Sequence, residues 1–156
     1  MADVTFSIPD DPPWLAAVGE VALLHGHVDF MLKMFIKNLA GLPWQEARNH
    51  TARWSSSSLR KEVIKLGKRL PTDASRTELT SLMGRHEDLS GKRHGNIHAL
   101  IGKEERDGEH VMASDTGPFG PRPSIEELNG LCDELEKLRD DLVTFLRYTI
   151  RPYGGT

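Results

Sequence analysis

An arginine and two histidines lie close together near position 95 of the chain, and these residue types can act on a phosphodiester. Arg93 is followed directly by His94 and, later, by His98. A guanidinium group holds phosphate oxygens through a fixed fork of donors, and an imidazole exchanges protons near neutral pH. The pattern counted is an arginine followed directly by Asn, Asp or His, with a histidine after a gap of four to six residues from the arginine. It is expected by chance roughly 0.2 times in a chain of this composition. Here it occurs once, which favours acid–base chemistry on a phosphate ester.

The pattern of an arginine, then Asn, Asp or His, then three residues and a histidine resembles the signature of the HEPN superfamily. Residues 93–98 read Arg-His-Gly-Asn-Ile-His in this chain. Members of that superfamily are small helical bundles that often act as metal-independent ribonucleases, commonly with the site at a dimer interface. Others are not catalytic and serve as partners or nucleotide binders. The resemblance covers the motif and is supported by a compatible order of helices from about residue 13 to about residue 150.

The resemblance implies a reaction in which the 2′-hydroxyl of RNA attacks the adjacent phosphodiester. His98 would move the proton, and Arg93 would stabilise the charge that builds on the phosphoryl oxygens. The products would be a 2′,3′-cyclic phosphate and a 5′-hydroxyl, with no metal or other cofactor, and DNA would not be cut because it lacks the nucleophile. We assign substrate binding to Lys92, His94 and Asn96. His94 is alternatively a second proton-transfer group.

A straight helix does not bring the two catalytic candidates together. Each residue turns by about 100°, so Arg93 and His98 would point about 140° apart. Convergence needs the helix to end or distort at Gly95, or a second copy of the motif to approach across a two-fold axis. Gly91 and Gly95 would allow a neighbouring helix or a ligand to come close, or they mark a fraying helix end. The HEPN resemblance implies the second arrangement, and a homodimer is expected on that ground.

Two further residues are candidates for an accessory role. His25 lies on the apolar stripe of the first predicted helix and Asp29 lies one turn later. His25 is more simply a hydrogen-bonded interior residue than a catalytic accessory. A less favoured alternative is a zinc site in which His94 and His98 are joined by His25, Asp29 or Glu20. A third alternative is a non-catalytic dimeric module that binds a nucleotide, or that pairs with a nucleotidyltransferase or antitoxin in a toxin or defence system.

The charge is distributed unevenly along the chain. The net charge of −3 argues against a protein that coats nucleic acid by bulk electrostatics. Residues 55–103, which include the motif, nevertheless carry ten basic and five acidic groups. This local positive charge could attract an RNA phosphate chain. The simpler interpretation of Arg60, Lys61, Lys65, Lys68 and Arg69 is a solvated helix face.

The apolar spacing predicts an all-α fold, an antiparallel up-and-down bundle of four to five helices in a single domain over 1–156. Helices are expected at about 13–40, 43–54, 59–70, 73–98 and 124–150, with a small hairpin near 99–114 around Asp107-Gly108. Residues 1–12 and 152–156 are expected to be extended tails, and 116–123 an irregular connection. Cys132, the single cysteine, cannot form an internal disulfide, and the start of the chain lacks a signal-peptide pattern. No continuous apolar run approaches the roughly 18 residues of a membrane span. A cytoplasmic protein without membrane association is expected.

Overall fold

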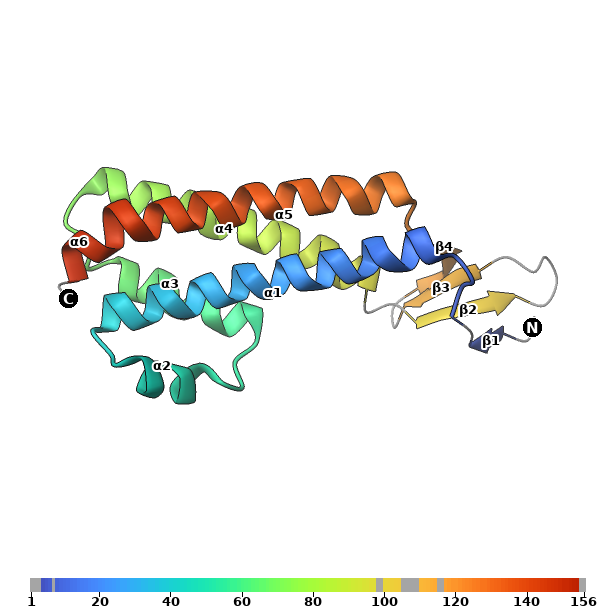
Figure 1. The fold of residues 1–156 in the computed structure, drawn as a ribbon, viewed down its shortest axis with the longest axis horizontal. Coiled ribbons are helices and arrows are strands. Elements are labelled where there is room, and N and C mark those ends of the chain that lie inside the picture. The colour runs from blue at the N-terminus through green and yellow to red at the C-terminus, as the bar shows by residue number, and fades with distance from the viewer. Residues whose placement is uncertain (1–3, 7, 98–99, 105–109, 115–116, 155–156) are drawn as a thin grey trace.

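Helices fill most of the chain and form a long bundle with a small sheet at one end (Figure 1). The computed structural model describes residues 4–6, 8–97, 100–104, 110–114 and 117–154. The helices are α1 (Pro12–Ala40), α2 (Trp44–Thr51), α3 (Ser56–Gly67), α4 (Asp73–Ile97) and α5 (Ile125–Phe145), followed by the π-helical turn η1 (Leu146–Ile150) and by α6 (Arg151–Gly154). The predicted helical bundle is confirmed. The tail beyond 151, predicted to be extended, is instead helical as far as Gly154.

Local capping signals explain where α1 and α5 begin and where α1 ends. Asp11 precedes α1 and accepts a hydrogen bond from the backbone N–H of Trp14 over 3.2 Å. Gly41 ends α1 with φ 67°, a left-handed conformation that glycine adopts without strain. Before α5, Ser124 and Glu127 form a reciprocal capping box. These contacts satisfy backbone groups that the helix ends leave without partners.

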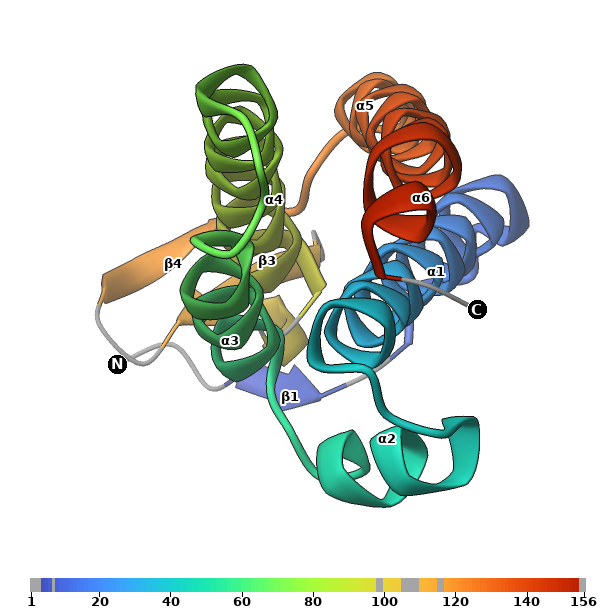
Figure 2. The same cartoon turned by 90° about the vertical axis from the view of Figure 1, so that its left-hand side faces the viewer.

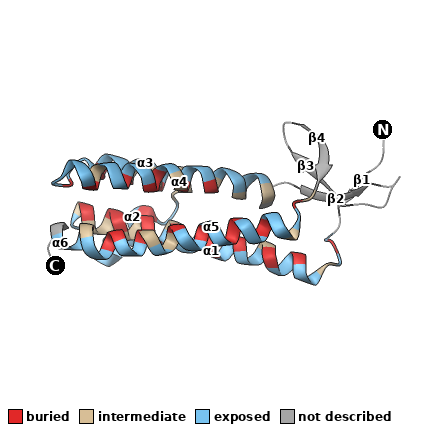
Figure 3. Ribbon diagram, turned by 90° about the horizontal axis from the view of Figure 1, so that it is seen from above, coloured by how far each residue is buried: buried red, intermediate tan, exposed pale blue. Residues whose placement is uncertain are grey.

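Helices α1 and α5 lie side by side and run in the same direction, and α4 runs opposite to both (Figures 1 and 2). Helix α3 packs against α1 and α4. Buried residues recur along one side of each long helix (Figure 3). Leucines recur along α5 in steps of three and four and form an apolar seam, and all of them are buried: Leu128, Leu131, Leu135, Leu138 and Leu142. Their burial against the other helices provides the main stabilising contribution to the bundle.

Contacts beside the first turn of α1 explain why α1 and α5 begin at the same end of the bundle. The indole Nε1 of Trp14 donates a hydrogen bond to the carbonyl oxygen of Pro123 over 2.8 Å. The guanidinium of Arg122 lies over the Trp14 ring at 4.9 Å and pairs with Asp11 at 2.7 Å. The segment before α5 is thus fixed to the start of α1.

Four short strands form an antiparallel sheet at that end. Their order is β1 (Val4–Phe6), β2 (Leu100–Glu104), β3 (His110–Ser114) and β4 (Gly117–Pro121). The two strands of the predicted hairpin, β2 and β3, are confirmed, while the Asp107-Gly108 turn lies outside the described residues. Two predictions were wrong in part. The N-terminal tail supplies the edge strand β1, and the connection expected to be irregular contains β4.

Helix α1 is long and apolar enough, by length and composition, to cross a membrane. Core helices of helical bundles pass the same test, so this is weak evidence. In the structure α1 buries Val21, Val28, Leu32, Phe35 and Ile36 within the bundle.

Candidate functional site

Three polar side chains meet inside the bundle between α1 and α4. His25 and Asp29 lie one turn apart on the same face of α1, and His25 Nδ1 is 3.6 Å from Asp29 Oδ2. From α4, His86 Nε2 is 3.0 Å from Asp29 Oδ1. Only 3% of His25 and 1% of His86 are exposed. Charged or polar groups are buried at this depth when they satisfy one another, and here they do.

The identity of the neighbours fixes the tautomer of His86. Arg60 on α3 places its NH1 3.4 Å from His86 Nδ1, and its NH2 pairs with Glu87 at 3.1 Å. A guanidinium can only donate, so His86 Nδ1 accepts and His86 Nε2 donates to Asp29.

Two serine hydroxyls complete the network. Ser56, at the start of α3, donates to Asp29 Oδ2 over 2.5 Å. Ser90 Oγ lies 3.0 Å from His25 Nε2. Burial raises the pKa of Asp29, but the hydrogen bonds from His86 and Ser56 and the electrostatic interaction with the two histidines outweigh that effect. The pKa of Asp29 is therefore lowered, and the carboxyl group is ionised at neutral pH.

The network lies beside a groove of about 620 Å³ between α1, α4 and the start of α3. His25 and Asp29 line it, together with Ser90, Arg93 and His94 from α4. The groove is where a ligand from solvent would reach the buried network.

Arg93 lines the groove and has a hydrogen-bond donor without an acceptor among the described residues. Its side chain is half-buried, and its Nε atom is buried without a hydrogen-bond partner among the described residues. A buried donor that makes no hydrogen bond lowers the free energy of unfolding by about 1–3 kcal/mol. Arg93 forms no ion pair with its helix neighbours Glu87 and Asp88, both of which the structure describes, and Glu87 pairs with Arg60 instead.

Four of the predicted site residues come together, because Arg93, His94, His25 and Asp29 all line the groove. His98 lies outside the described residues. Asn96 is half-buried near the end of α4 and is not among the residues that line the groove.

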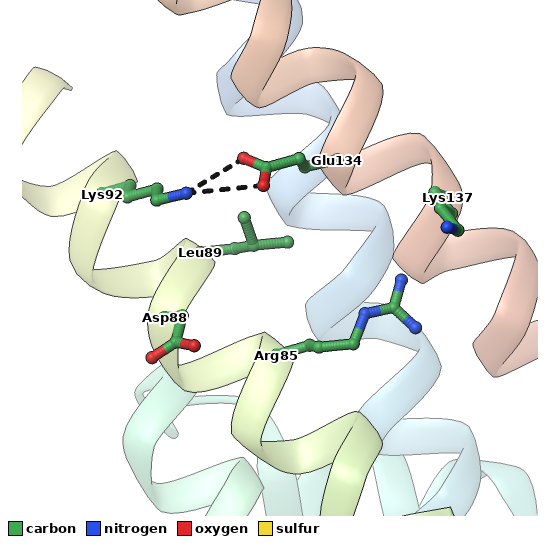
Figure 4. Close-up of a pocket in the computed structure, with 6 residues that line it drawn as sticks. All are labelled: Arg85, Asp88, Leu89, Lys92, Glu134 and Lys137. Carbon is green, nitrogen blue, oxygen red and sulfur yellow. Dashed lines mark hydrogen bonds and ion pairs between the residues drawn. The ribbon is translucent and has the colours of Figure 1, made fainter.

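The prediction that Lys92 belongs to the same site is not supported by its position. Lys92 lines a smaller pocket of about 240 Å³ between α4 and α5. There its Nζ pairs with Glu134 at 3.1 Å (Figure 4). The reason is helical phase: consecutive residues turn by about 100°, so Lys92 and Arg93 project from different sides of α4.

Sequence reasoning missed His86 and misjudged Arg60. His86 follows Met83 and precedes Leu89 on the buried stripe of α4, so the spacing of that stripe was an available signal. The Arg60 side chain, interpreted as part of a solvated face, is only 12% exposed. No local pattern marks a buried arginine, since its position depends on packing between α3 and α4.

The glycines near the motif are open. A Cβ atom added at Gly91 or Gly95 would meet nothing within 4 Å. No part of the described chain therefore approaches the helix closely there. Gly91 is well inside α4 and lines the groove, so it leaves room for a ligand rather than for another helix of this chain.

The candidate zinc ligands that the structure brings together differ from the set that the sequence suggested. Among the described residues, the group whose ligand atoms all lie within 4.8 Å of one another is His25, Asp29 and His86, without His94. Glu20 is exposed.

Comparison with protein-family models, curated proteins and solved structures finds no match to this chain.

Proposed function

We propose that the groove binds RNA and that the chain cleaves it without a metal, by attack of a 2′-hydroxyl on the adjacent phosphodiester. One observation carries this proposal: Arg93, with a donor that has no partner among the described residues, lines the same groove as His94. A phosphate oxygen is the acceptor that best suits such a donor, because the guanidinium fork matches its geometry.

The roles of the groups follow from their chemistry. Arg93 holds the non-bridging oxygens and stabilises the negative charge that develops on them. His98, which the HEPN resemblance assigns to proton transfer, follows Ile97, the last residue of α4. His94 is exposed at the groove and is the second proton-transfer group of the proposal. Arg60 also lines the groove, but it pairs with Glu87 there, so Arg93 is the cation that the proposal assigns to the phosphate.

A homodimer belongs to this proposal because the HEPN resemblance implies a site at a dimer interface, and residues five apart on a straight helix would point about 140° apart. A second copy would bring an imidazole to the phosphate held by Arg93. Sedimentation at micromolar concentration tests this part, and a monomer at concentrations where RNA is cut would refute it. Cytoplasmic location and a toxin or defence role with an antitoxin or nucleotidyltransferase partner remain parts of the same proposal.

The experiment is incubation of the purified chain with labelled RNA, and with DNA of the same sequence, in excess EDTA. Arg93→Ala and His98→Ala should each lower the cleavage rate by about 100-fold or more. Arg93→Lys, which keeps the charge but loses the fork, should restore little of it. Lys92→Ala is the matched control, since its side chain pairs with Glu134 away from the groove, and it should cut at the wild-type rate.

End-group analysis should give 2′,3′-cyclic phosphates and 5′-hydroxyls. Cleavage of DNA, cleavage only with an added metal, or an equal loss in Lys92→Ala would overturn the proposal. RNA binding without cleavage, lost in Arg93→Ala, would identify the non-catalytic module instead. The mutually satisfied contacts of His25, Asp29 and His86 favour that second candidate, because such a network is also what a purely structural interior contains.

A further inference from the structure

We propose that His25, Asp29 and His86 form a binding site for one divalent transition metal ion, with zinc as the ion to test, beside the groove. Two imidazoles and a carboxylate are a ligand set that zinc takes in proteins. Three protein ligands leave one coordination position open, and here that position adjoins the groove that His25 and Asp29 line. The site does not use Arg93, so this inference stands apart from RNA cleavage.

The separations of the ligand atoms fit a shared ion. Ligands at 2.0–2.1 Å from a tetrahedral zinc lie about 3.3 Å from one another. His86 Nε2 is 3.0 Å from Asp29 Oδ1, and His25 Nδ1 is 3.6 Å from the other carboxylate oxygen, Oδ2. All three groups lie within 4.8 Å of each other, so the two imidazoles need only a modest approach to converge. The hydrogen bonds of the structure thus hold the groups near the distances that an ion would require.

The surroundings of His25 and Asp29 also suit a metal. When His25 binds an ion through Nδ1, its Nε2 carries a proton, and Ser90 Oγ is 3.0 Å away to accept it. Ser56 donates to Asp29 Oδ2, and Oδ1, which now accepts from His86 Nε2, becomes available once Nε2 binds the ion instead.

Arg60 opposes metal binding at this site. His86 would bind through Nε2 and therefore carry its proton on Nδ1, which now faces Arg60 NH1 at 3.4 Å. Two donors would then face each other, so Arg60 must turn away when the ion binds. Its other partner, Glu87, has a side chain that is 67% exposed and can follow it. Removing the guanidinium should consequently strengthen binding rather than weaken it.

The test uses the full chain after removal of metals by EDTA and dialysis. Calorimetric titration with zinc chloride should show one site per chain. Cobalt should give the strong visible bands of a tetrahedral ion. Arg60→Met should bind zinc at least threefold more tightly than wild type, and His86→Gln and Asp29→Asn at least tenfold more weakly.

Control variants separate this site from other histidines. His27→Ala removes an exposed histidine of α1 and should leave the affinity unchanged. His94→Ala removes the histidine of the alternative zinc set and should also leave it unchanged. Circular dichroism checks that each variant is folded. If His86→Gln does not fold, the tighter zinc binding expected of Arg60→Met still tests the proposal.

The absence of saturable binding, or binding lost in His94→Ala or His27→Ala, would overturn the proposal. Weaker binding in folded Arg60→Met would overturn it as well. None of these readouts involves RNA, so failure of the metal site and failure of the ribonuclease proposal are recognised separately.

Discussion

His86 Nε2 donates a hydrogen bond to Asp29 Oδ1 over 3.0 Å, and this contact joins α4 to α1 inside the bundle. His86 is almost completely buried, whereas Asp29 reaches the groove. The contact therefore links the packing of the core to the wall of the candidate site. In an interior of low dielectric constant such a polar pair fixes the relative position of two helices, because any other arrangement leaves a buried group without its partner.

Asp29→Asn should lower the free energy of unfolding at pH 7 by about 1–3 kcal/mol. The amide keeps the shape of the carboxyl group but loses the charge and one acceptor, so it cannot accept from both His86 and Ser56 as Asp29 does. Urea denaturation measures the difference. Asp88→Asn, an exposed carboxylate of α4, is the matched control and should change stability far less.

The difference in the free energy of unfolding between wild type and Asp29→Asn should depend on pH. The pKa of Asp29 is lowered from its ordinary 3.8 in the folded state. Its contribution to stability is therefore complete above about pH 4 and is lost as pH falls through the folded-state pKa. The gap between wild type and Asp29→Asn should shrink from pH 5 to pH 3. A gap that stays constant over that range would show that the charge of Asp29 does not stabilise the fold.

Gly91→Ala should raise the free energy of unfolding by about 1 kcal/mol, because alanine favours a helix and the new Cβ meets nothing within 4 Å. If RNA occupies the groove, the same methyl group should lower the cleavage rate. Gly84→Ala is the matched control on α4, equally open but away from the groove. It should give the same stabilisation with unchanged cleavage. Equal cleavage by both variants would exclude close approach of RNA at Gly91.

Helix positions could be predicted from sequence because their signals are local. Apolar spacing and the Ser124 capping box placed the helices within a few residues. Strand β1 could not be predicted in this way, because its pairing with β2 joins residues about a hundred positions apart. The same limit applies to the site. The motif indicated Arg93, but its grouping with Asp29 depends on how α4 packs on α1.

Trp14→Phe should destabilise the protein by about 1–3 kcal/mol, because the carbonyl oxygen of Pro123 loses the indole donor at 2.8 Å in a buried position. Trp44→Phe is the control: Trp44 is 39% exposed, and its described contact is a ring interaction with Phe30 that phenylalanine can largely keep. Urea denaturation of both variants checks this. Equal losses would mean that aromatic volume, and not the hydrogen bond, holds the start of α5 against α1.

Cys132 should resist thiol reagents until the bundle opens. Burial raises the pKa of its thiol to about 11, and the acidic groups of Glu20, Asp133 and Glu136 add to the effect. The reactive thiolate is therefore scarce at pH 8, and the sulfur is also shielded from solvent. Labelling with an aromatic disulfide should be more than about 100-fold slower in the folded chain than in urea.

Because Cys132 is the single cysteine, its labelling rate reports one event, the exposure of the α5 seam. Asp29→Asn should accelerate labelling in proportion to the stability it loses, if α5 is exposed only by global unfolding. A rate that does not respond to Asp29→Asn would instead show that α5 separates from α1 without breaking the contact between Asp29 and His86.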